Sequence, residues 1–241
     1  MTTGCLCLHG FTGSPWELEP LAERLRKKYR WLVYTPVLPG HNENENLKEV
    51  SYKTWIYKAD LAARELFLHC DQVYVIGFSM GGMLASYIAA RYPVAKVVLL
   101  GAAAQYIGAG QLMKDMAEML ESGIKGQMKK HPWYPIFYEK VHTPLHAVRE
   151  FQKAVKAVTP FLKDVTVPVF IGQGVQDGLV PRRSAQFLYE KMTMPVKKLY
   201  FYEQSKHFLC HGANSEQVME DVENFLIDDI PDGEIVWKSA Y

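Results

Sequence analysis

The sequence lacks several features that would place it in a specialised class of protein. It has no long apolar run: the longest, from Val97 to Ala104, is far too short to cross a bilayer. It has no excess of either charge, because 27 lysines and arginines face 26 aspartates and glutamates. A nucleic-acid-binding protein usually carries a clear basic excess. We therefore expect no nucleic-acid partner and no stable membrane insertion.

Cysteine is also scarce, and the four cysteines present form no Cys-x-x-Cys pair. A disulfide framework is therefore not expected, and the sparse thiols favour a reducing compartment. The first residues, from Met1 to Gly4, have no positively charged side chain and do not resemble a signal peptide. These features predict a cytoplasmic protein. A hydrophobic content of 49% with 22% charged residues is typical of a globular domain.

Six short apolar runs alternate with longer helical patterns along the chain. Most runs are rich in β-branched or aromatic residues and are apolar at consecutive positions, as buried parallel strands are. The alternation predicts an α/β fold, with a mostly parallel sheet of about six strands and helices on both faces. The expected strands are Cys5–Leu8, Trp31–Thr35, Val73–Ile76, Val97–Leu100, Val167–Ile171 and Lys198–Tyr202.

Helix signals lie between these runs. The segment Ser14-Pro15-Trp16-Glu17 has the pattern of a capping box with proline at the first helical position. We expect it to open a helix that runs to about Lys28. Further helices are expected at Thr54–His69, Met80–Tyr92, Arg183–Met192 and Ser215–Leu226.

The connection between the fourth and fifth expected strands is longer than a crossover needs. It contains helical patterns of its own, including a helix expected to start at Thr143-Pro144. We interpret residues 104–160 as a cap (lid) inserted into a core made of residues 1–103 and 161–241. Ligands of open α/β sheets bind at the sheet edge that such a cap would cover.

Two points about this segment stay open. Its amphipathic patterns are also compatible with two ordinary packing helices. Its glycines could let a cap move or could be ordinary loop residues. These glycines are Gly108, Gly110, Gly123 and Gly126.

The most informative segment is Gly77-Phe78-Ser79-Met80-Gly81, which has the pattern Gly-x-Ser-x-Gly between an expected strand and an expected helix. Glycines at these positions permit a strained turn that exposes the serine oxygen at the end of the strand. The start of the helix also favours negative charge near Ser79. The pattern predicts Ser79 as a nucleophile. The alternative is a glycine-rich turn without chemistry.

The loop His9-Gly10-Phe11-Thr12-Gly13 follows the first expected strand. Such a loop can aim a backbone N–H at an acyl oxygen, and the residue after the nucleophile supplies a second donor. We therefore expect the main-chain N–H groups of Phe11 and Met80 to form an oxyanion hole. A competing interpretation makes His9 a metal ligand with Cys5 and Cys7, but no second pair with metal-ligand spacing supports it. His9 is better explained as a brace for the loop.

A nucleophilic serine needs a base, and the base needs an orienting group. Asp177 follows the fifth expected strand and His207 follows the sixth, in the chain order serine, acid, histidine that this architecture uses. Asp177 could instead be a turn residue beside Gly178. His211 competes with His207 but lies further into its loop. Asp164 precedes its strand and would lie at the opposite edge of the sheet.

Together these motifs resemble the α/β-hydrolase fold, and more narrowly the small bacterial carboxylesterases and monoacylglycerol-lipase-like enzymes. The resemblance implies a triad of Ser79, Asp177 and His207 and a small cap after the fourth strand. The chain departs from the family where Lys206 replaces a small residue, and the usual first antiparallel strands are expected to be absent. The matching segments are Leu8–Gly13, Gly77–Gly82, Asp177 before Val180-Pro181, and Tyr202–His207.

These residues predict a serine carboxylesterase for short- to medium-chain acyl esters, including monoacylglycerols, that works without metal or organic cofactor. The open alternatives are a thioesterase, cleavage of a carbon–carbon bond by the same triad, and a non-catalytic binding protein on this scaffold. The partner expected is a small-molecule ester, and the oligomeric state stays open. The residues expected to contact substrate are Phe11, Met80, Ile107, Met116, Trp133, Leu179 and Phe208.

Overall fold

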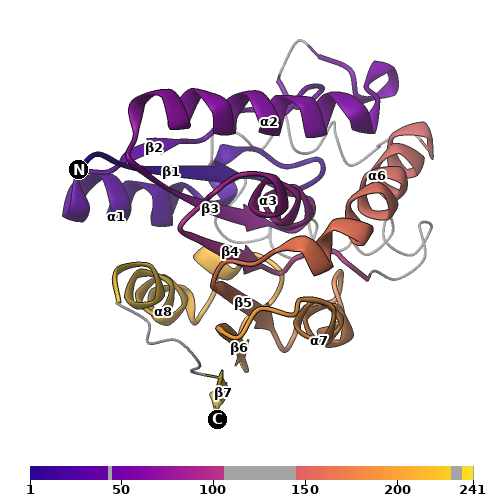
Figure 1. Ribbon diagram of the computed structural model, residues 1–241. Coiled ribbons are helices and arrows are strands. Elements are labelled where there is room, and N and C mark those ends of the chain that lie inside the picture. Colours follow the sequence, from indigo (N-terminus) through magenta and orange to yellow (C-terminus); the bar gives the residue numbers. More distant parts are fainter. Residues whose placement is uncertain (43–44, 106–144, 229–234, 241) are drawn as a thin grey trace.

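The computed structural model describes residues 1–42, 45–105, 145–228 and 235–240. The strands in these residues form one seven-stranded sheet in the order β2-β1-β3-β4-β5-β6-β7, in which all neighbours are parallel (Figure 1). The chain runs from β1 to one side of the sheet and then returns to the other side at β3. Ligands of open α/β sheets bind at such a switch point, beyond the carboxyl ends of the strands. The strands are β1 (Thr3–Leu8), β2 (Leu32–Tyr34), β3 (Gln72–Phe78), β4 (Lys96–Leu100), β5 (Val169–Gly174), β6 (Lys197–Tyr202) and β7 (Ile235–Ala240).

The predicted α/β fold is confirmed, and each of the six expected strands is present with small shifts at its ends. The seventh strand, β7, was not predicted. It pairs with β6 alone, at the edge of the sheet. Its sequence, Ile-Val-Trp-Lys-Ser-Ala, is apolar only in its first half. An edge strand of this kind does not produce the continuous apolar run that identifies a strand covered on both faces.

Helices cover both faces of the sheet (Figure 1). Alternate strand residues such as Val75 and Leu99 pack into one core cluster, with side chains of α2, α3, α6 and α7. Their neighbours Ile76 and Leu100 pack into a second cluster, with side chains of α1 and α8. This alternation follows from the two-residue period of a strand. The helices are α1 (Glu19–Tyr29), α2 (Tyr52–His69), α3 (Met80–Arg91), α6 (Leu145–Val158), α7 (Arg182–Lys191) and α8 (Ser215–Ile227).

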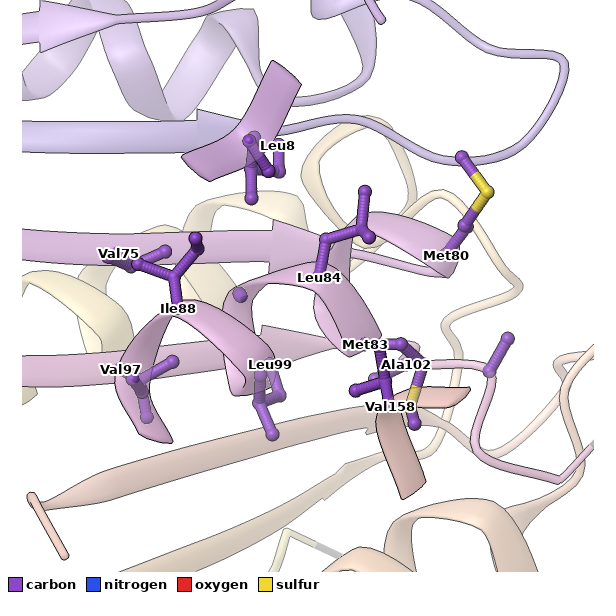
Figure 2. Packing of buried hydrophobic residues seen from close by; sticks show 14 of the residues in the cluster. Leu8, Val75, Met80, Met83, Leu84, Ile88, Val97, Leu99, Ala102 and Val158 are labelled. Carbon is purple, nitrogen blue, oxygen red and sulfur yellow. The ribbon is translucent and has the colours of Figure 1, made fainter. Parts of the chain in front are cut away.

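The helix α3 lies against the middle of the sheet, and its position fixes the residue that precedes it. Leu84 and Ile88 are fully buried among side chains of β3 and β4 (Figure 2). Burial of a leucine or isoleucine contributes roughly 1.5–3 kcal/mol relative to exposure. The start of α3 is therefore held against the carboxyl ends of these strands.

The predicted capping box is wrong, and so is the single helix that it was expected to open. The Ser14 side chain makes no capping hydrogen bond, and a 3-10 turn, η1 (Pro15–Glu17), precedes α1 as a separate element. The Glu17 carboxyl group accepts a hydrogen bond from the Gly10 N–H instead, at 2.6 Å. A contact across the preceding loop has thus replaced the local contact that the pattern predicts.

The predicted cap, residues 104–160, falls largely outside the described residues, which omit 106–144. The helix expected from Thr143-Pro144 is confirmed as α6. Its buried face contacts α2 and α3 and joins the core cluster of that side of the sheet. The assignment of 104–160 as a cap stays a prediction.

Candidate active site

Ser79 lies at the sharp turn between β3 and α3. Its backbone has φ 53° and ψ −117°, a conformation that side-chain-bearing residues rarely adopt. The Ser79 N–H donates to the Leu100 carbonyl at 3.0 Å, and the Ala103 N–H donates to the Ser79 carbonyl at 3.2 Å. The neighbouring strand thereby holds the strained turn in place, as expected for a residue whose conformation must be imposed by its surroundings.

Two glycines make this turn possible. A Cβ on Gly77 would lie far inside van der Waals contact of the Gly81 carbonyl oxygen. A Cβ on Gly81 would meet the Leu8 carbonyl oxygen in the same way. The leaving helix therefore approaches the entering strand too closely for a side chain at Gly77, and it approaches the end of β1 too closely for a side chain at Gly81. The two glycines of the Gly-x-Ser-x-Gly pattern have the steric role that the sequence predicts.

Asp177 lies just beyond β5, and its carboxylate accepts four hydrogen bonds. Oδ1 accepts from the backbone N–H groups of Leu179 and Val180, both at 2.9 Å. Oδ2 accepts from Gln173 Nε2 at 3.0 Å and lies 2.7 Å from His207 Nδ1. A carboxylate that is saturated with donors in this way has a fixed orientation. Asp177 is thus more than a turn residue.

His207 follows β6 and is buried, with 3% of its surface exposed. Its Nδ1 donates to Asp177, so the lone pair of Nε2 is the one that can accept a proton. The ring lies against Phe78, with centroids 4.7 Å apart, and Phe78 immediately precedes Ser79. Within the described residues the Ser79 hydroxyl makes no hydrogen bond to this imidazole. Such hydrogen bonds are often long until substrate is bound.

The loop after β1 lies beside the nucleophile. A Cβ on Gly10 would come within 3.1 Å of the Ser79 Cβ, so the backbone of the loop passes directly by the serine. The Phe11 N–H has no hydrogen-bond partner among the described residues. Met80 is the first residue of α3, where helix N–H groups have no acceptor within the helix. Both main-chain donors named from the sequence are therefore available beside Ser79.

The competing interpretations from the sequence can now be compared with the structure. His9 braces its loop, because it accepts from the Leu38 N–H at 3.0 Å through Nε2. No cluster of potential metal ligands occurs in the part of the chain that is described. His211 stacks on the Trp16 ring and donates to the Trp16 carbonyl, which gives it a structural role. Asp164 ends the 3-10 turn η4 (Thr159–Asp164), before β5 begins.

Four of the residues expected to contact substrate are described. Phe11, Met80 and Leu179 are buried in one core cluster, while Phe208 packs against the cluster on the opposite face of the sheet. The Phe208 ring also lies 5.8 Å from the His207 ring. The remaining three, Ile107, Met116 and Trp133, lie outside the described residues. Contact of these seven side chains with substrate stays a prediction.

Sequence reasoning missed three polar side chains that hold this site together. Gln173 binds the acid, Glu17 binds the loop at Gly10, and His41 accepts the N–H of Thr12 at 3.1 Å. All three are almost fully buried. Gln173 could have been suspected, because a polar residue within an otherwise apolar strand usually has a partner. His41 is 29 residues from the atom it binds, and no local pattern indicates that contact.

A parallel sheet with a strained serine turn after one central strand and a paired Asp and His after two others defines a hydrolase of the α/β class. The comparisons agree. A family model described as the alpha/beta hydrolase fold matches residues 6–147, and the chain belongs to this family. A second model, described as serine aminopeptidase S33, matches residues 127–214.

Curated relatives cover most of the chain. A thermostable monoacylglycerol lipase from Bacillus sp. (strain H-257) is 26% identical over 221 residues, which are 90% of this chain and 87% of the relative. A carboxylesterase from Bacillus subtilis (strain 168) is 23% identical over 235 residues, 92% of this chain and 91% of the relative. Both are named as enzymes of the esterase and lipase type.

Solved structures of lipolytic enzymes and esterases superpose on this chain. One of two metagenome-derived lipolytic enzymes, reported as LipS and LipT, superposes with a TM-score of 0.76 at 25% identity and covers 93% of both chains. An esterase from Exiguobacterium antarcticum superposes with a TM-score of 0.69 at 19% identity, covering 94% of this chain and 92% of its own. The second likeness concerns the fold alone. Taken with the family, these relatives support a hydrolase of the esterase and lipase type.

Proposed function

We propose that this protein is a serine carboxylesterase that hydrolyses short- to medium-chain acyl esters through an acyl-enzyme. The observation that carries the proposal is the pair formed by Asp177 and His207 at 2.7 Å, with the imidazole packed on Phe78 beside the strained Ser79. A buried His–Asp pair beside a serine at a sharp turn is the arrangement that activates a hydroxyl.

The reaction follows from the roles of five residues. His207 Nε2 takes the hydroxyl proton of Ser79 as the oxygen attacks the ester carbonyl, and the main-chain N–H groups of Phe11 and Met80 bind the resulting oxyanion. His207 then protonates the leaving alcohol, and the acyl group remains on Ser79. The imidazole next removes a proton from water as the water oxygen attacks the acyl carbonyl, and it returns that proton to Ser79 Oγ as the bond to the acyl group breaks and the acid is released. Asp177 holds the ring and stabilises its charged form.

The acyl preference is inferred from apolar residues near the oxyanion loop and in the segment after β4. Phe11 packs on Phe151 of α6, with ring centroids 5.1 Å apart, so an apolar wall stands beside the expected oxyanion donor. Such surroundings favour an apolar acyl chain. We extend the proposal to monoacylglycerols because a relative covering most of the chain is a monoacylglycerol lipase.

The remaining parts of the proposal concern the cap and the compartment. We propose that residues 104–160 form a cap over the carboxyl edge of the sheet. None of the helices in the described part of the chain has the length and hydropathy needed to span a membrane. All four cysteines are free and buried, and this supports the expectation of a reducing, cytoplasmic environment.

The test is turnover of p-nitrophenyl esters from acetate to palmitate by the wild type and by Ser79→Ala. We expect a maximum at short to medium chains and loss of nearly all activity in the variant. Equal rates in the two proteins would remove Ser79 from the mechanism, and a flat chain-length profile would remove the acyl preference. Labelling by a fluorophosphonate probe separates an active serine from a non-catalytic scaffold.

Other bonds are open to the same triad. Parallel assays on an acyl-CoA thioester, an aminoacyl p-nitroanilide and a p-nitrophenyl ester compare these chemistries directly. The amide is included because the second family model is described as a serine aminopeptidase. We expect the ester to have the highest kcat/KM. A higher value for either of the others would reassign the substrate class while leaving the triad in place.

A further inference from the structure

The backbone N–H groups of the two residues on either side of Phe11 are each bound by a buried side chain. On one side the Gly10 N–H donates to Glu17 Oε2 at 2.6 Å. On the other side the Thr12 N–H donates to His41 Nε2 at 3.1 Å. The Phe11 N–H between them has no partner among the described residues. The donors on either side of the expected oxyanion donor are therefore engaged, and of these three N–H groups only that of Phe11 is left to bind a ligand.

The tautomer of His41 is determined by its other nitrogen. Nδ1 lies 3.0 Å from the Pro39 carbonyl and 3.2 Å from the Leu38 carbonyl, so it must carry the proton that it donates. Nε2 is then an acceptor, as the Thr12 N–H requires. The ring is 1% exposed, and the Trp55 indole N–H fixes the same Pro39 carbonyl at 2.9 Å. His41 thus has little freedom to move away from the loop.

Glu17 is buried beside the loop that it binds. It is 4% exposed and belongs to the 3-10 turn η1, directly after the loop. A Cβ on Gly13 would overlap its carboxyl group, so that glycine leaves the space in which the carboxyl lies. The Glu17 carboxyl group can therefore reach the Gly10 N–H because residue 13 has no side chain.

The loop needs such support. Thr12 has φ 61°, in the left-handed region that a β-branched residue rarely adopts. A peptide in this conformation relaxes when its hydrogen-bond partner is lost. The Phe11 N–H belongs to the 10–11 peptide, whose carbonyl accepts from the Gly13 N–H at 3.3 Å and lies 2.8 Å from His9 Nδ1. Relaxation of the neighbouring 9–10 or 11–12 peptide would shift this unit and turn the Phe11 N–H away from the position where charge develops on the substrate.

We propose that Glu17 and His41 are positioning residues that clamp the oxyanion loop and hold the Phe11 N–H toward the reacting carbonyl. This inference rests on the proposed function, because it assigns a purpose to the Phe11 donor. Neither residue touches substrate. Their effect is transmitted through one backbone hydrogen bond each. Loss of one oxyanion donor costs about 10²–10³-fold in kcat, and its displacement should cost a part of that.

The test uses pairs of variants that differ in reach. Glu17→Gln keeps an acceptor oxygen at the same distance from the backbone, while Glu17→Asp shortens it by one methylene group. His41→Gln places an acceptor near the position of Nε2, while His41→Asn ends near the position of Nδ1 and cannot reach Thr12. All four are polar and conservative in volume. Matched controls are Glu223→Gln, at a buried carboxyl between α1 and α8, and His69→Asn, at an exposed histidine of α2.

The readouts are kcat and KM for p-nitrophenyl butyrate, normalised to the fraction of serine labelled by a fluorophosphonate, and the inhibition constant of a trifluoromethyl ketone. We expect the two short variants to lose about 10- to 100-fold in kcat with KM within about twofold. The ketone forms an oxyanion on the enzyme, so its inhibition constant should rise in proportion to the loss in kcat. The two Gln variants should recover most of the loss, and both controls should match the wild type.

Two results would overturn the clamp: unchanged kcat per labelled site in both short variants, or Gln variants as impaired as their short counterparts. Loss of folded protein without change in kcat per site would also count against it, since that is a purely structural role. Failure of the proposed function is seen separately, as wild-type turnover that does not depend on Ser79.

Discussion

Asp177 and His207 are joined through one oxygen of the carboxylate, Oδ2, while the other oxygen is occupied by two backbone amides. Because the two carboxylate oxygens have different partners, they cannot exchange roles. The Leu179 and Val180 N–H groups require an oxygen at the Oδ1 position. An amide introduced at residue 177 must therefore turn its NH₂ group toward His207.

Asp177→Asn should consequently abolish most activity without unfolding the protein. The NH₂ group would donate to His207 Nδ1, force the proton onto Nε2 and leave the imidazole unable to act as a base. We expect kcat to fall on the order of 10³–10⁴-fold. The measurement is ester turnover beside thermal unfolding. A fall in kcat below tenfold would show that the carboxylate does not set the tautomer.

Gln173 should contribute to both activity and stability. Its Nε2 donates to Asp177 Oδ2, whereas its Oε1 is buried without a partner among the described residues. Gln173→Leu removes the donor to the acid, and a hydrogen bond to a charged group is worth roughly 1.5–3 kcal/mol. We expect kcat to fall about tenfold or more and the melting temperature to fall as well, because the Asp177 carboxylate and the Val180 carbonyl both lose a buried donor.

The control for this prediction is Gln173→Glu, which places a second carboxylate beside Asp177. Like charges at this distance disfavour each other, so this variant should lose more activity than the leucine variant. Equal activity of both variants and the wild type would show that Gln173 has no influence on the acid.

Glu17 should make stability depend on pH. Burial raises the pKa of its carboxyl group to about 8, while the hydrogen bond from the Gly10 N–H opposes the rise. Between the unfolded pKa, near 4.5, and the folded value the native state holds a proton that the unfolded chain releases, so stability falls as the pH rises through this window. The slope for one group can reach about 1.4 kcal/mol per pH unit.

The comparison that isolates this group is Glu17→Gln, which keeps the acceptor but cannot ionise. From pH 5 to pH 8 the free energy of unfolding of the wild type should fall relative to that of the variant. Above pH 8 the difference between the two proteins should stay constant. Urea unfolding of both proteins across this range gives the difference. Parallel stability curves would contradict the raised pKa.

Gly81→Ala should prevent the native packing of α3 on β1, because the added methyl group meets backbone atoms of Leu8 and His9. Neither strand nor helix can yield without losing core contacts, so we expect a loss of several kcal/mol and little soluble protein. Gly178→Ala is the matched control, since its Cβ would meet nothing within 4 Å. Its stability should stay within about 0.5 kcal/mol of the wild type.

The parts of this architecture that follow local rules were predictable, and those that depend on distant contacts were not. The six apolar runs and the Gly-x-Ser-x-Gly pattern predict strands and a sharp turn because glycine and consecutive β-branched residues have strong local preferences. The same reasoning failed at Glu17, where a buried loop amide outcompeted a local cap for the carboxyl group. It also failed at β7, whose sequence is only partly apolar at the edge of the sheet.

The candidate site divides in the same way. Ser79, Asp177 and His207 could be named because each follows a strand, and carboxyl ends of parallel strands meet at one edge. Gln173 stands out as a polar residue in an apolar strand, but neither its contact with Asp177 nor the contact of His41 with the loop after β1 could be named. Their partners are set by how loops pack after the sheet has formed, and that arrangement leaves no periodic trace in the sequence.

The stack of Phe11 on Phe151 sets a condition for anyone who engineers the substrate range of this protein. Exchanging residues 104–160, the proposed cap, for a segment from another hydrolase would also replace α6 and remove the Phe151 ring that packs on Phe11 in the proposed oxyanion loop. A successful chimera should therefore graft only up to residue 144 or supply a flat aromatic side chain where Phe151 stood.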